Sequence, residues 1–155
     1  MAISRRTDYA LRLVAIMAAS GDEPISVRTA SEAQGVPYAF ARSIQHDLTL
    51  AGIVTARRGS HGGVVLARPA SELTVLDIIE AMQGRLTMSV CAVDDDWCPR
   101  SDHCAFHELW IGADKILRDY LASYTIESLA SDFAAGGAEA IARHARAFGA
   151  EDAQE

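Results

Sequence analysis

Cysteine is absent from residues 1–90 and 105–155 of this 155-residue chain, because all three cysteines lie between Cys91 and Cys104. Three is an odd number for a disulfide framework, and thiols stay reduced in the cytosol. A cluster of cysteines in such a chain favours metal binding or redox chemistry over structural disulfides. The segment that carries the cysteines is therefore the first candidate for function.

Long hydrophobic runs are also absent. The longest, at residues 11–19, is too short and too interrupted to span a bilayer, and residues 1–12 lack an apolar core followed by a small-residue cleavage site. We therefore expect a cytoplasmic protein with no membrane partner.

The sequence contains no nucleophile–base pair and no glycine-rich phosphate loop that opens a helix. Its glycine-rich stretch, GSHGG at residues 59–63, lies instead in a predicted hairpin. We therefore expect no enzymatic activity.

Charge is distributed unevenly along the chain. The net charge is −7, yet residues 1–70 carry eight arginines and five acidic residues, which makes this part +3, and residues 71–155 carry −10. A basic N-terminal part can face nucleic-acid phosphates, whereas the acidic remainder cannot. Half of the residues are apolar, which is enough to form the core of one ordinary domain.

Three helices are predicted in the N-terminal part. The apolar residues of segment 4–20 recur at helical spacing, Ser26 caps a short helix that ends at Gly35, and Pro37 opens a longer one. A turn around the glycine joins the second and third helices, so the pair predicts a helix-turn-helix unit. On the third helix, four apolar side chains are expected to face inward: Phe40, Ile44, Leu48 and Leu50.

A basic hairpin is predicted directly after these helices. Two short aliphatic or β-branched runs, at residues 53–55 and 64–66, flank the segment RRGSHGG, whose glycines permit a tight bend. Helix, turn, helix and basic hairpin in this order are the pattern of a winged helix. We assign residues 1–84, including a capped helix that ends at Gly84, to this DNA-binding domain.

The C-terminal half is predicted to consist of a loop and two helices. Three consecutive aspartates and a proline break regular structure before Cys104, and the helix that follows has more apolar surface than a lone exposed helix should show. We therefore expect that helix to pack outside its own domain. The fold class is mainly α, with segments bounded as follows: loop 85–107, long and short helices 104–135, and a frayed tail 136–155.

DNA contacts are expected from the third helix and the hairpin. Major-groove readers place the N-terminal part of the second helix of the motif against base edges, where Arg42 can donate two hydrogen bonds to guanine. Tyr38 and Ser43 are expected to contact phosphate, and arginines beside glycines suit a backbone or a narrow minor groove. The candidate DNA-binding residues are Arg28, Tyr38, Arg42, Ser43, His46, Arg57, Arg58, Ser60 and His61.

The thiols and a nearby imidazole follow the pattern C-x6-C-x5-C-x2-H. Thiolates suit zinc or iron–sulfur clusters, but neither cysteine spacing is the tight C-x2-C of structural zinc sites. Cys104 and His107 stand three residues apart at a helix start, so both can point the same way. Because the loop is hydrophilic, three unrelated buried cysteines are a poor explanation. The spacing alone leaves zinc, an iron–sulfur cluster and redox thiols open.

Several segments in order resemble the bacterial Rrf-two family of winged-helix regulators. They are RRTDYALRLVAIMAAS, residues 36–69, the helix LTVLDIIEAMQG, and the C…C…CxxHxLW segment. The likeness implies a homodimeric transcriptional regulator, expected to be a repressor, that binds a palindromic operator in double-stranded DNA. It also implies that the long helix pairs two subunits, and that a 4Fe–4S or 2Fe–2S cluster controls operator affinity by sensing redox, nitric oxide or iron status.

The resemblance implies that Cys91, Cys98 and Cys104 are cluster ligands, but it offers two fourth ligands. Asp8 matches the position from which NsrR-type members supply an aspartate of the partner subunit, and His107 matches the histidine of IscR-type members. A carboxylate is a hard, easily displaced ligand, whereas imidazole suits a more persistent site. Because the first helix is NsrR-like, we favour Asp8, with His107 as the alternative.

Two further points stay open at this stage. Arg42 stands where IscR-type members have a glutamate, so the resemblance does not imply an operator sequence. The alternative function, in another class, is a zinc- or thiol-based redox-responsive winged-helix module that acts through protein contacts.

Overall fold

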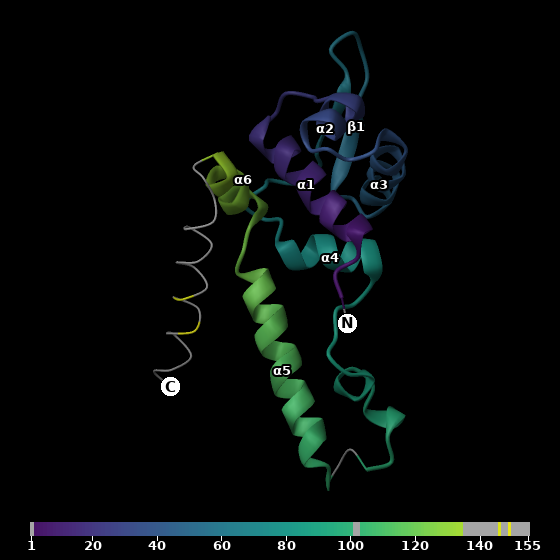
Figure 1. Ribbon diagram of the computed structural model, residues 1–155, viewed down its shortest axis with the longest axis vertical. Coiled ribbons are helices and arrows are strands. Elements are labelled where there is room, and N and C mark those ends of the chain that lie inside the picture. The colour runs from purple at the N-terminus through teal and green to yellow at the C-terminus, as the bar shows by residue number, and fades with distance from the viewer. Residues whose placement is uncertain (1, 101–102, 135–145, 147–148, 150–155) are drawn as a thin grey trace.

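The computed structural model describes residues 2–100, 103–134, 146 and 149. Figure 1 shows a body of helices with a hairpin at one end and a long helix that extends away from this body. The expected fold class, a mainly helical winged helix with a small hairpin, is confirmed. The elements are α1 (Arg5–Ala19), α2 (Val27–Ala33), α3 (Tyr38–Leu50), β1 (Val54–Arg57), β2 (Gly63–Leu66), α4 (Val75–Gln83), η1 (Val90–Ala92), η2 (Asp95–Trp97), α5 (Ala105–Ala122) and α6 (Ile126–Ala134).

Local sequence signals set the ends of these helices. The Ser26 side chain accepts a hydrogen bond from the Thr29 N–H and so caps α2. At α4, Thr74 and Asp77 form a reciprocal capping box. The turn between α2 and α3 needs φ of +62° at Gly35, a conformation that residues with a Cβ rarely adopt. The expected tail over 136–155 lies outside the described residues except at positions 146 and 149.

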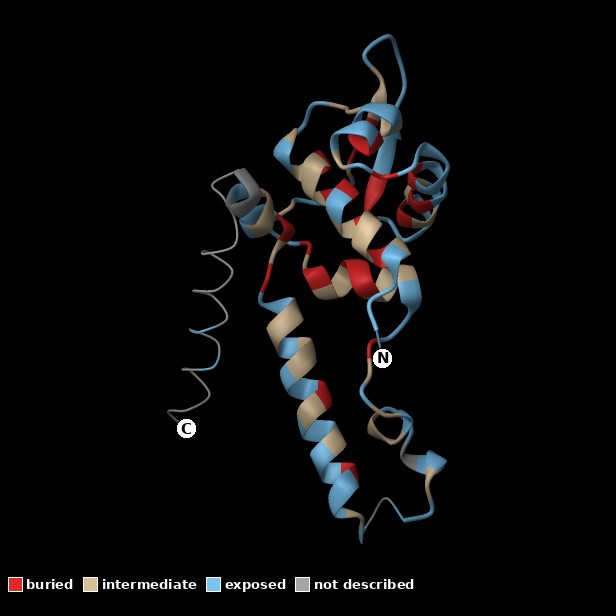
Figure 2. Ribbon diagram, in the orientation of Figure 1, coloured by how far each residue is buried: buried red, intermediate tan, exposed pale blue. Residues whose placement is uncertain are grey.

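The main core lies where α1 crosses the other elements of the body. Figure 2 shows the buried residues concentrated in this body, while most of α5 is exposed or intermediate. A second, smaller cluster joins the body to α5 through Val75, Ile79, Leu86 and Tyr124. Fully buried side chains of the main core include Leu13, Val14, Met17, Ile44, Leu48, Ile78 and Ile126.

The predicted inward face of α3 is confirmed for two of its four residues. Ile44 and Leu48 are fully buried, but Phe40 is 49% exposed and Leu50 is 76% exposed, so the prediction was wrong for these two. The inner stripe of α3 runs through Ala41, Ile44 and Leu48 at helical spacing, and positions 40 and 50 fall outside it.

The predicted hairpin is present and is anchored to the helices. β1 pairs antiparallel with β2, from Val54 opposite Leu66 to Arg57 opposite Gly63. Ile25, between α1 and α2, forms an isolated antiparallel β-bridge with Val64 and so ties β2 to the α1–α2 connection. A Cβ at Gly63 would lie 2.6 Å from the carbonyl oxygen of Ile25, so the close approach requires glycine.

After α5 the chain returns to the body. Thr125 forms a bridge with Thr74 at the start of α4, and α6 then packs on α1. The far end of α5 therefore projects from the body together with the cysteine-bearing segment, as Figure 1 shows. Within the part of the chain that the structure describes, no helix is long and apolar enough to cross a membrane.

Candidate nucleic-acid interface and cysteine site

The structure places the candidate DNA-binding residues on α2, on α3 and on the hairpin. We call the hairpin, residues 54–66, the wing. All nine are exposed. Arg28 lies on α2, four of the candidates lie on α3, and the rest lie on the wing. A recognition helix flanked by a basic wing is the surface with which winged helices contact DNA.

Arg28 and Tyr38 connect α2 to the start of α3. The guanidinium carbon of Arg28 lies 4.3 Å from the centre of the Tyr38 ring, within the range of a cation–π contact. The contact orients the tyrosine at the N-terminal end of α3, which is the end that meets base edges in this motif.

Arg6 lies beside the candidate DNA-binding residues of α3, and the sequence analysis did not identify it. From α1, its Nη2 donates a hydrogen bond of 2.8 Å to the Ser43 hydroxyl and another to the carboxylate of Asp47. Ser43 is therefore engaged by the protein itself, and Arg6 adds a cation beside α3. The sequence signal was weak, because two arginines at a helix start do not reveal which helix they meet.

The two arginines of the wing play different roles. Arg57 Nη1 donates a hydrogen bond of 2.8 Å to the backbone carbonyl of Asp22, so this side chain fastens the end of β1, next to the turn of the wing, to the α1–α2 connection. Arg58 lies in the exposed turn, together with Ser60 and His61, whose hydroxyl and Nδ1 are 3.1 Å apart. The turn thus presents a guanidinium, a hydroxyl and an imidazole to solvent.

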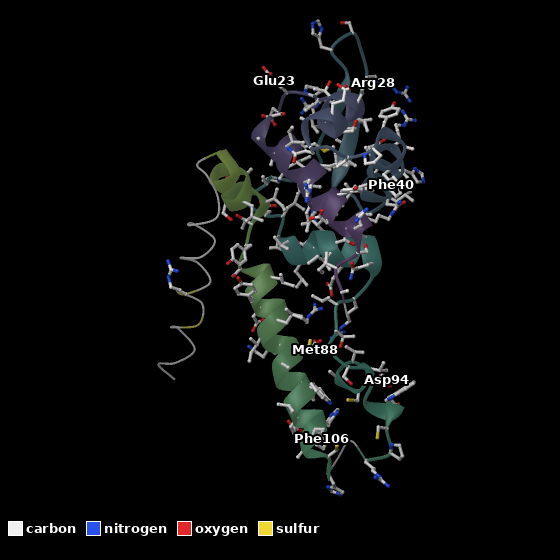
Figure 3. All side chains as sticks on the ribbon, viewed as in Figure 1. Glu23, Arg28, Phe40, Met88, Asp94 and Phe106 are labelled. Atoms are coloured by element: carbon white, nitrogen blue, oxygen red, sulfur yellow. The ribbon has the colours of Figure 1, made fainter. Side chains whose placement is uncertain are left out.

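The cysteine-bearing segment, residues 85–104, folds back along α5. Its backbone is tied to that helix at two points. The Met88 N–H donates a hydrogen bond of 2.9 Å to the buried carboxylate of Asp114, and Arg118 donates one of 3.1 Å to the carbonyl of Leu86. Figure 3 shows Met88 between the segment and α5 and Asp94 farther out. The segment is therefore held at its beginning and is more exposed toward its cysteines.

Glu80 at the end of α4 completes this junction. Its carboxylate accepts hydrogen bonds from Arg118 and, at 3.0 Å, from the Leu86 N–H. Burial alone would raise the pKa of Glu80, but the bonds from Arg118 and Leu86 outweigh it and hold the pKa below the ordinary value of 4.5. The hydrogen bond with Glu80 in turn raises the pKa of Arg118. One ion pair thus joins the winged helix, the cysteine-bearing segment and α5.

The three thiols are partly exposed and are not gathered into one site. Cys91 Sγ lies 3.2 Å from the Ser89 hydroxyl. Within the described ranges, no three His, Cys, Asp or Glu side chains are close enough to hold one metal ion. Residues 101 and 102, between the second and third cysteines, lie outside the described residues.

His107 is the group whose position fits a ligand. The residue is 9% exposed, and its Nδ1 is buried. Among the described residues, this is the one buried side-chain nitrogen or oxygen atom that has no hydrogen-bond partner. A buried polar atom without a partner is uncommon, and this nitrogen is available to act as a ligand. Three thiolates and an imidazole form a donor set that suits zinc or an iron–sulfur cluster.

Asp8 lies in a different part of the molecule. It is on α1 within the winged helix, where its carboxylate forms an ion pair of 3.0 Å with Arg12, and it is half exposed. Within one chain the structure does not group it with the cysteines. It lies instead at the edge of a largely apolar hollow of about 390 Å³, whose other lining residues are Leu11, Arg12, Ala15, Gln34, Val75, Ile126 and Leu129.

Comparisons with known proteins agree with this geometry. The family model of Rrf2, described as an iron-dependent transcriptional regulator, matches residues 3–132. The Aau3 protein of Rhizobium meliloti is 34% identical over 131 residues, which are 83% of this chain and 84% of that protein. The transcriptional regulator IscR of Photorhabdus laumondii is 26% identical over 133 residues, or 85% and 80% of the two chains. The structure of CymR, the global cysteine regulator of B. subtilis, superposes with a TM-score of 0.71 at 29% identity, covering 84% of this chain and 97% of that one.

Proposed function

Because the chain belongs to the Rrf2 (Rrf-two) family of DNA-binding transcriptional regulators, we propose that it is a homodimeric repressor whose affinity for a palindromic operator is set by an iron–sulfur cluster on Cys91, Cys98 and Cys104. One observation carries the proposal. A segment with three thiols, beside a buried imidazole nitrogen without a hydrogen-bond partner, is tied to the winged helix by the Glu80–Arg118 ion pair.

The DNA-facing part of the proposal rests on α3 and the wing. The N-terminal part of α3 enters the major groove, where Arg42 reads a base edge, while Arg58 in the wing contacts phosphate. Arg57 and Arg28 act mainly by holding the wing and Tyr38 in place.

An apolar seam on α5 supports the homodimer. Phe106, Leu109 and Ile116 are 67%, 55% and 58% exposed, and with Ala113 they follow the alternating three- and four-residue spacing of a coiled-coil seam. The seam lies away from the face that carries His107 and Asp114, which is turned toward the cysteine-bearing segment. A second copy of α5 packed on the seam would bury these side chains. Two-fold symmetry then matches a palindromic operator.

The chain's own residues account for cluster binding and for its coupling to DNA. When bound, the cluster supplies a centre that responds to oxidants, nitric oxide or iron supply. The thiolates of the three cysteines would hold it. A change in the backbone of this segment when the cluster binds or is lost would act on Leu86 and Met88, whose partners are Arg118 and Asp114 on α5.

Asp8 remains the favoured fourth ligand, supplied by the second subunit. Its carboxylate is half exposed, and the hollow beside it offers space for part of another chain. His107 is the alternative, and the lack of a partner for its Nδ1 supports it directly. A ligand from the second subunit would make the cluster a bridge between protomers, whereas His107 would keep the site within one chain.

Anaerobic purification tests the cluster. We expect brown protein with bound iron and sulfide, and we expect the colour to be lost when Cys91, Cys98 or Cys104 is replaced by alanine. Ser89→Ala is the matched control, because Ser89 contacts Cys91 but donates no thiolate. Colourless protein that carries stoichiometric zinc and no sulfide would contradict the proposal.

A thiol-based regulator is the second candidate function. Two observations favour it: the thiols are partly exposed and apart, and a solved relative is named a global cysteine regulator. In this case the purified protein contains no iron, and its DNA affinity changes when the thiols are oxidised and returns when they are reduced. The same cysteine variants would then abolish the response to oxidant.

A further inference from the structure

We propose that the hollow between α1 and the N-terminal turn of α3 receives the methyl group of a thymine, and that Phe40 thereby helps to determine the operator sequence. The inference rests on the operator binding described above and adds to it a residue and a base. The hollow measures about 260 Å³ and is lined by Arg6, Ala39, Phe40 and Ser43.

Phe40 is an aromatic residue that is half exposed on the surface of α3, and this exposure needs an explanation. It is the third residue of α3 and is 49% exposed, so half of an apolar ring faces solvent on a surface otherwise rich in polar groups. On the protein side, the ring of Tyr9 meets it edge to face, with the ring centres 6.1 Å apart. Figure 3 shows Phe40 on α3 beside α1. The contact holds the ring in one orientation and leaves its outer part open.

DNA offers one apolar group on its major-groove edges. The C5 methyl of thymine distinguishes that base from cytosine, and side chains such as alanine and phenylalanine recognise it by apolar contact. The first turn of α3 is the part of a recognition helix that reaches base edges. Ala39 and Phe40 supply apolar walls at this place, whereas Arg42 is suited to guanine. The hollow therefore fits thymine better than the other three bases.

The opposite side of the hollow carries a guanidinium that is paired with the Asp47 carboxylate. Arg6 is held there by its hydrogen bonds to Ser43 and Asp47, with about a third of its side chain exposed. A thymine methyl lies close to the backbone of its own strand, so a cation next to the apolar walls meets a phosphate when the methyl enters. Apolar walls and a fixed guanidinium thus match two neighbouring parts of one nucleotide.

Deoxyuridine gives a direct test, because it differs from thymidine only in lacking the methyl group. Operator DNA would first be selected from a random duplex library with the full chain. Each thymine of the selected site would then be replaced in turn by deoxyuridine, and affinities measured by fluorescence anisotropy at fixed salt. We expect the wild-type protein to lose about fourfold in affinity for each methyl that enters the hollow, the value of one buried methyl-sized group.

The Phe40→Ala variant should lose affinity for the thymine operator and become indifferent to deoxyuridine at that same position. Leu50→Ala is the matched control. It shortens an even more exposed apolar side chain, at the other end of the same helix, and should keep the wild-type response. Phe40→Gln keeps a long side chain beside Tyr9 but makes this wall of the hollow polar, and it covers the case in which Phe40→Ala unfolds.

The outcomes separate this inference from the function on which it rests. Failure to enrich any sequence from the library would contradict operator binding itself. If a site is enriched but no thymine in it responds to loss of the methyl, the inference is wrong. It is also wrong if folded Phe40→Ala or Phe40→Gln responds to deoxyuridine at every position as the wild type does.

Discussion

Arg118 on α5 hydrogen-bonds the Glu80 carboxylate at the end of α4, and the same guanidinium donates to the backbone carbonyl of Leu86. The side chains of this pair are 25% and 29% exposed, so the pair is less screened by water than an ordinary surface ion pair. It stands where the body, the cysteine-bearing segment and α5 meet. Any movement of that segment relative to the winged helix must act on these two residues.

Glu80→Gln is expected to lower the free energy of unfolding by about 1 kcal/mol, because it removes a charge-assisted hydrogen bond at a partly buried site. Urea denaturation at neutral pH measures the change. Asp119→Asn is the matched control, since it breaks a more exposed ion pair with Lys115 on the same helix and should change stability by less than about 0.5 kcal/mol. Equal effects of the two variants would show that the junction has no special role.

The stabilisation from Glu80 should depend on pH in one direction. Because the folded state holds its pKa below the ordinary 4.5, the contribution is complete above that value and is lost as the pH falls through the lower, folded pKa. The stability difference between wild type and Glu80→Gln should therefore be constant near neutral pH and disappear in acid. A difference that persists undiminished in strong acid would contradict this assignment.

Leu109→Asp or Ile116→Asp is expected to convert the homodimer to monomers, because each places a charge in the exposed seam of α5. Sedimentation equilibrium or light scattering measures the change. Ile111→Asp places the same charge on the same helix outside the seam and should leave the mass unchanged. A wild-type chain that is already monomeric at micromolar concentration would contradict the homodimer.

Arg58→Ala should weaken binding to every DNA sequence and reduce the slope of log affinity against log salt by about 1, as loss of one phosphate contact does.

Arg57→Ala should act differently from Arg58→Ala. Its guanidinium holds the Asp22 carbonyl, so its loss loosens the turn end of the wing and should lower affinity with a smaller change in salt slope. Arg42→Ala should instead relax base preference at one operator position, at a cost of roughly 1–3 kcal/mol.

Asp8→Ala and His107→Ala decide between the two fourth ligands. If Asp8 of the second subunit completes the site, its loss should alter the visible spectrum and speed cluster loss to oxygen or nitric oxide, while His107→Ala changes only local packing. The reverse pattern assigns the ligand to His107. Loss of a direct ligand should exceed the roughly 10–100-fold effect typical of groups one layer farther from a metal, so the two variants should not look alike. If neither spectrum changes, both assignments are wrong.

The sequence was most informative where a signal is local. Ser26 as a cap, Gly35 as a turn and the glycine-rich wing are each encoded within a few residues, and the structure confirms them. The inner stripe of α3 was only partly predictable. Helical periodicity identified Ile44 and Leu48 as buried. A shift of one position along the helix decides whether a side chain near its start faces the core, and it is Ala41, not Phe40, that is buried.

Long-range pairs could not be predicted, because nothing nearby in the sequence marks them. Arg6 meets Ser43 across 37 positions, and Glu80 meets Arg118 across 38. The three cysteines were easy to identify from composition, yet their spacing in the sequence could not show that, among the described residues, no three His, Cys, Asp or Glu side chains are grouped closely enough for one metal ion.

The projection of α5 from the body has an optical consequence. Both tryptophans of the chain, Trp97 and Trp110, belong to η2 and α5, while the winged helix contains none. From Trp110 to Ala122, the end of α5 that meets the body, the helix is about 18 Å long, so this indole lies well away from the recognition surface. Emission excited selectively in tryptophan therefore reports on the cysteine end alone, and a fluorescent label on the DNA reports on the other end. The unmodified protein thus carries its own probe for timing chemistry at one end against release of DNA at the other.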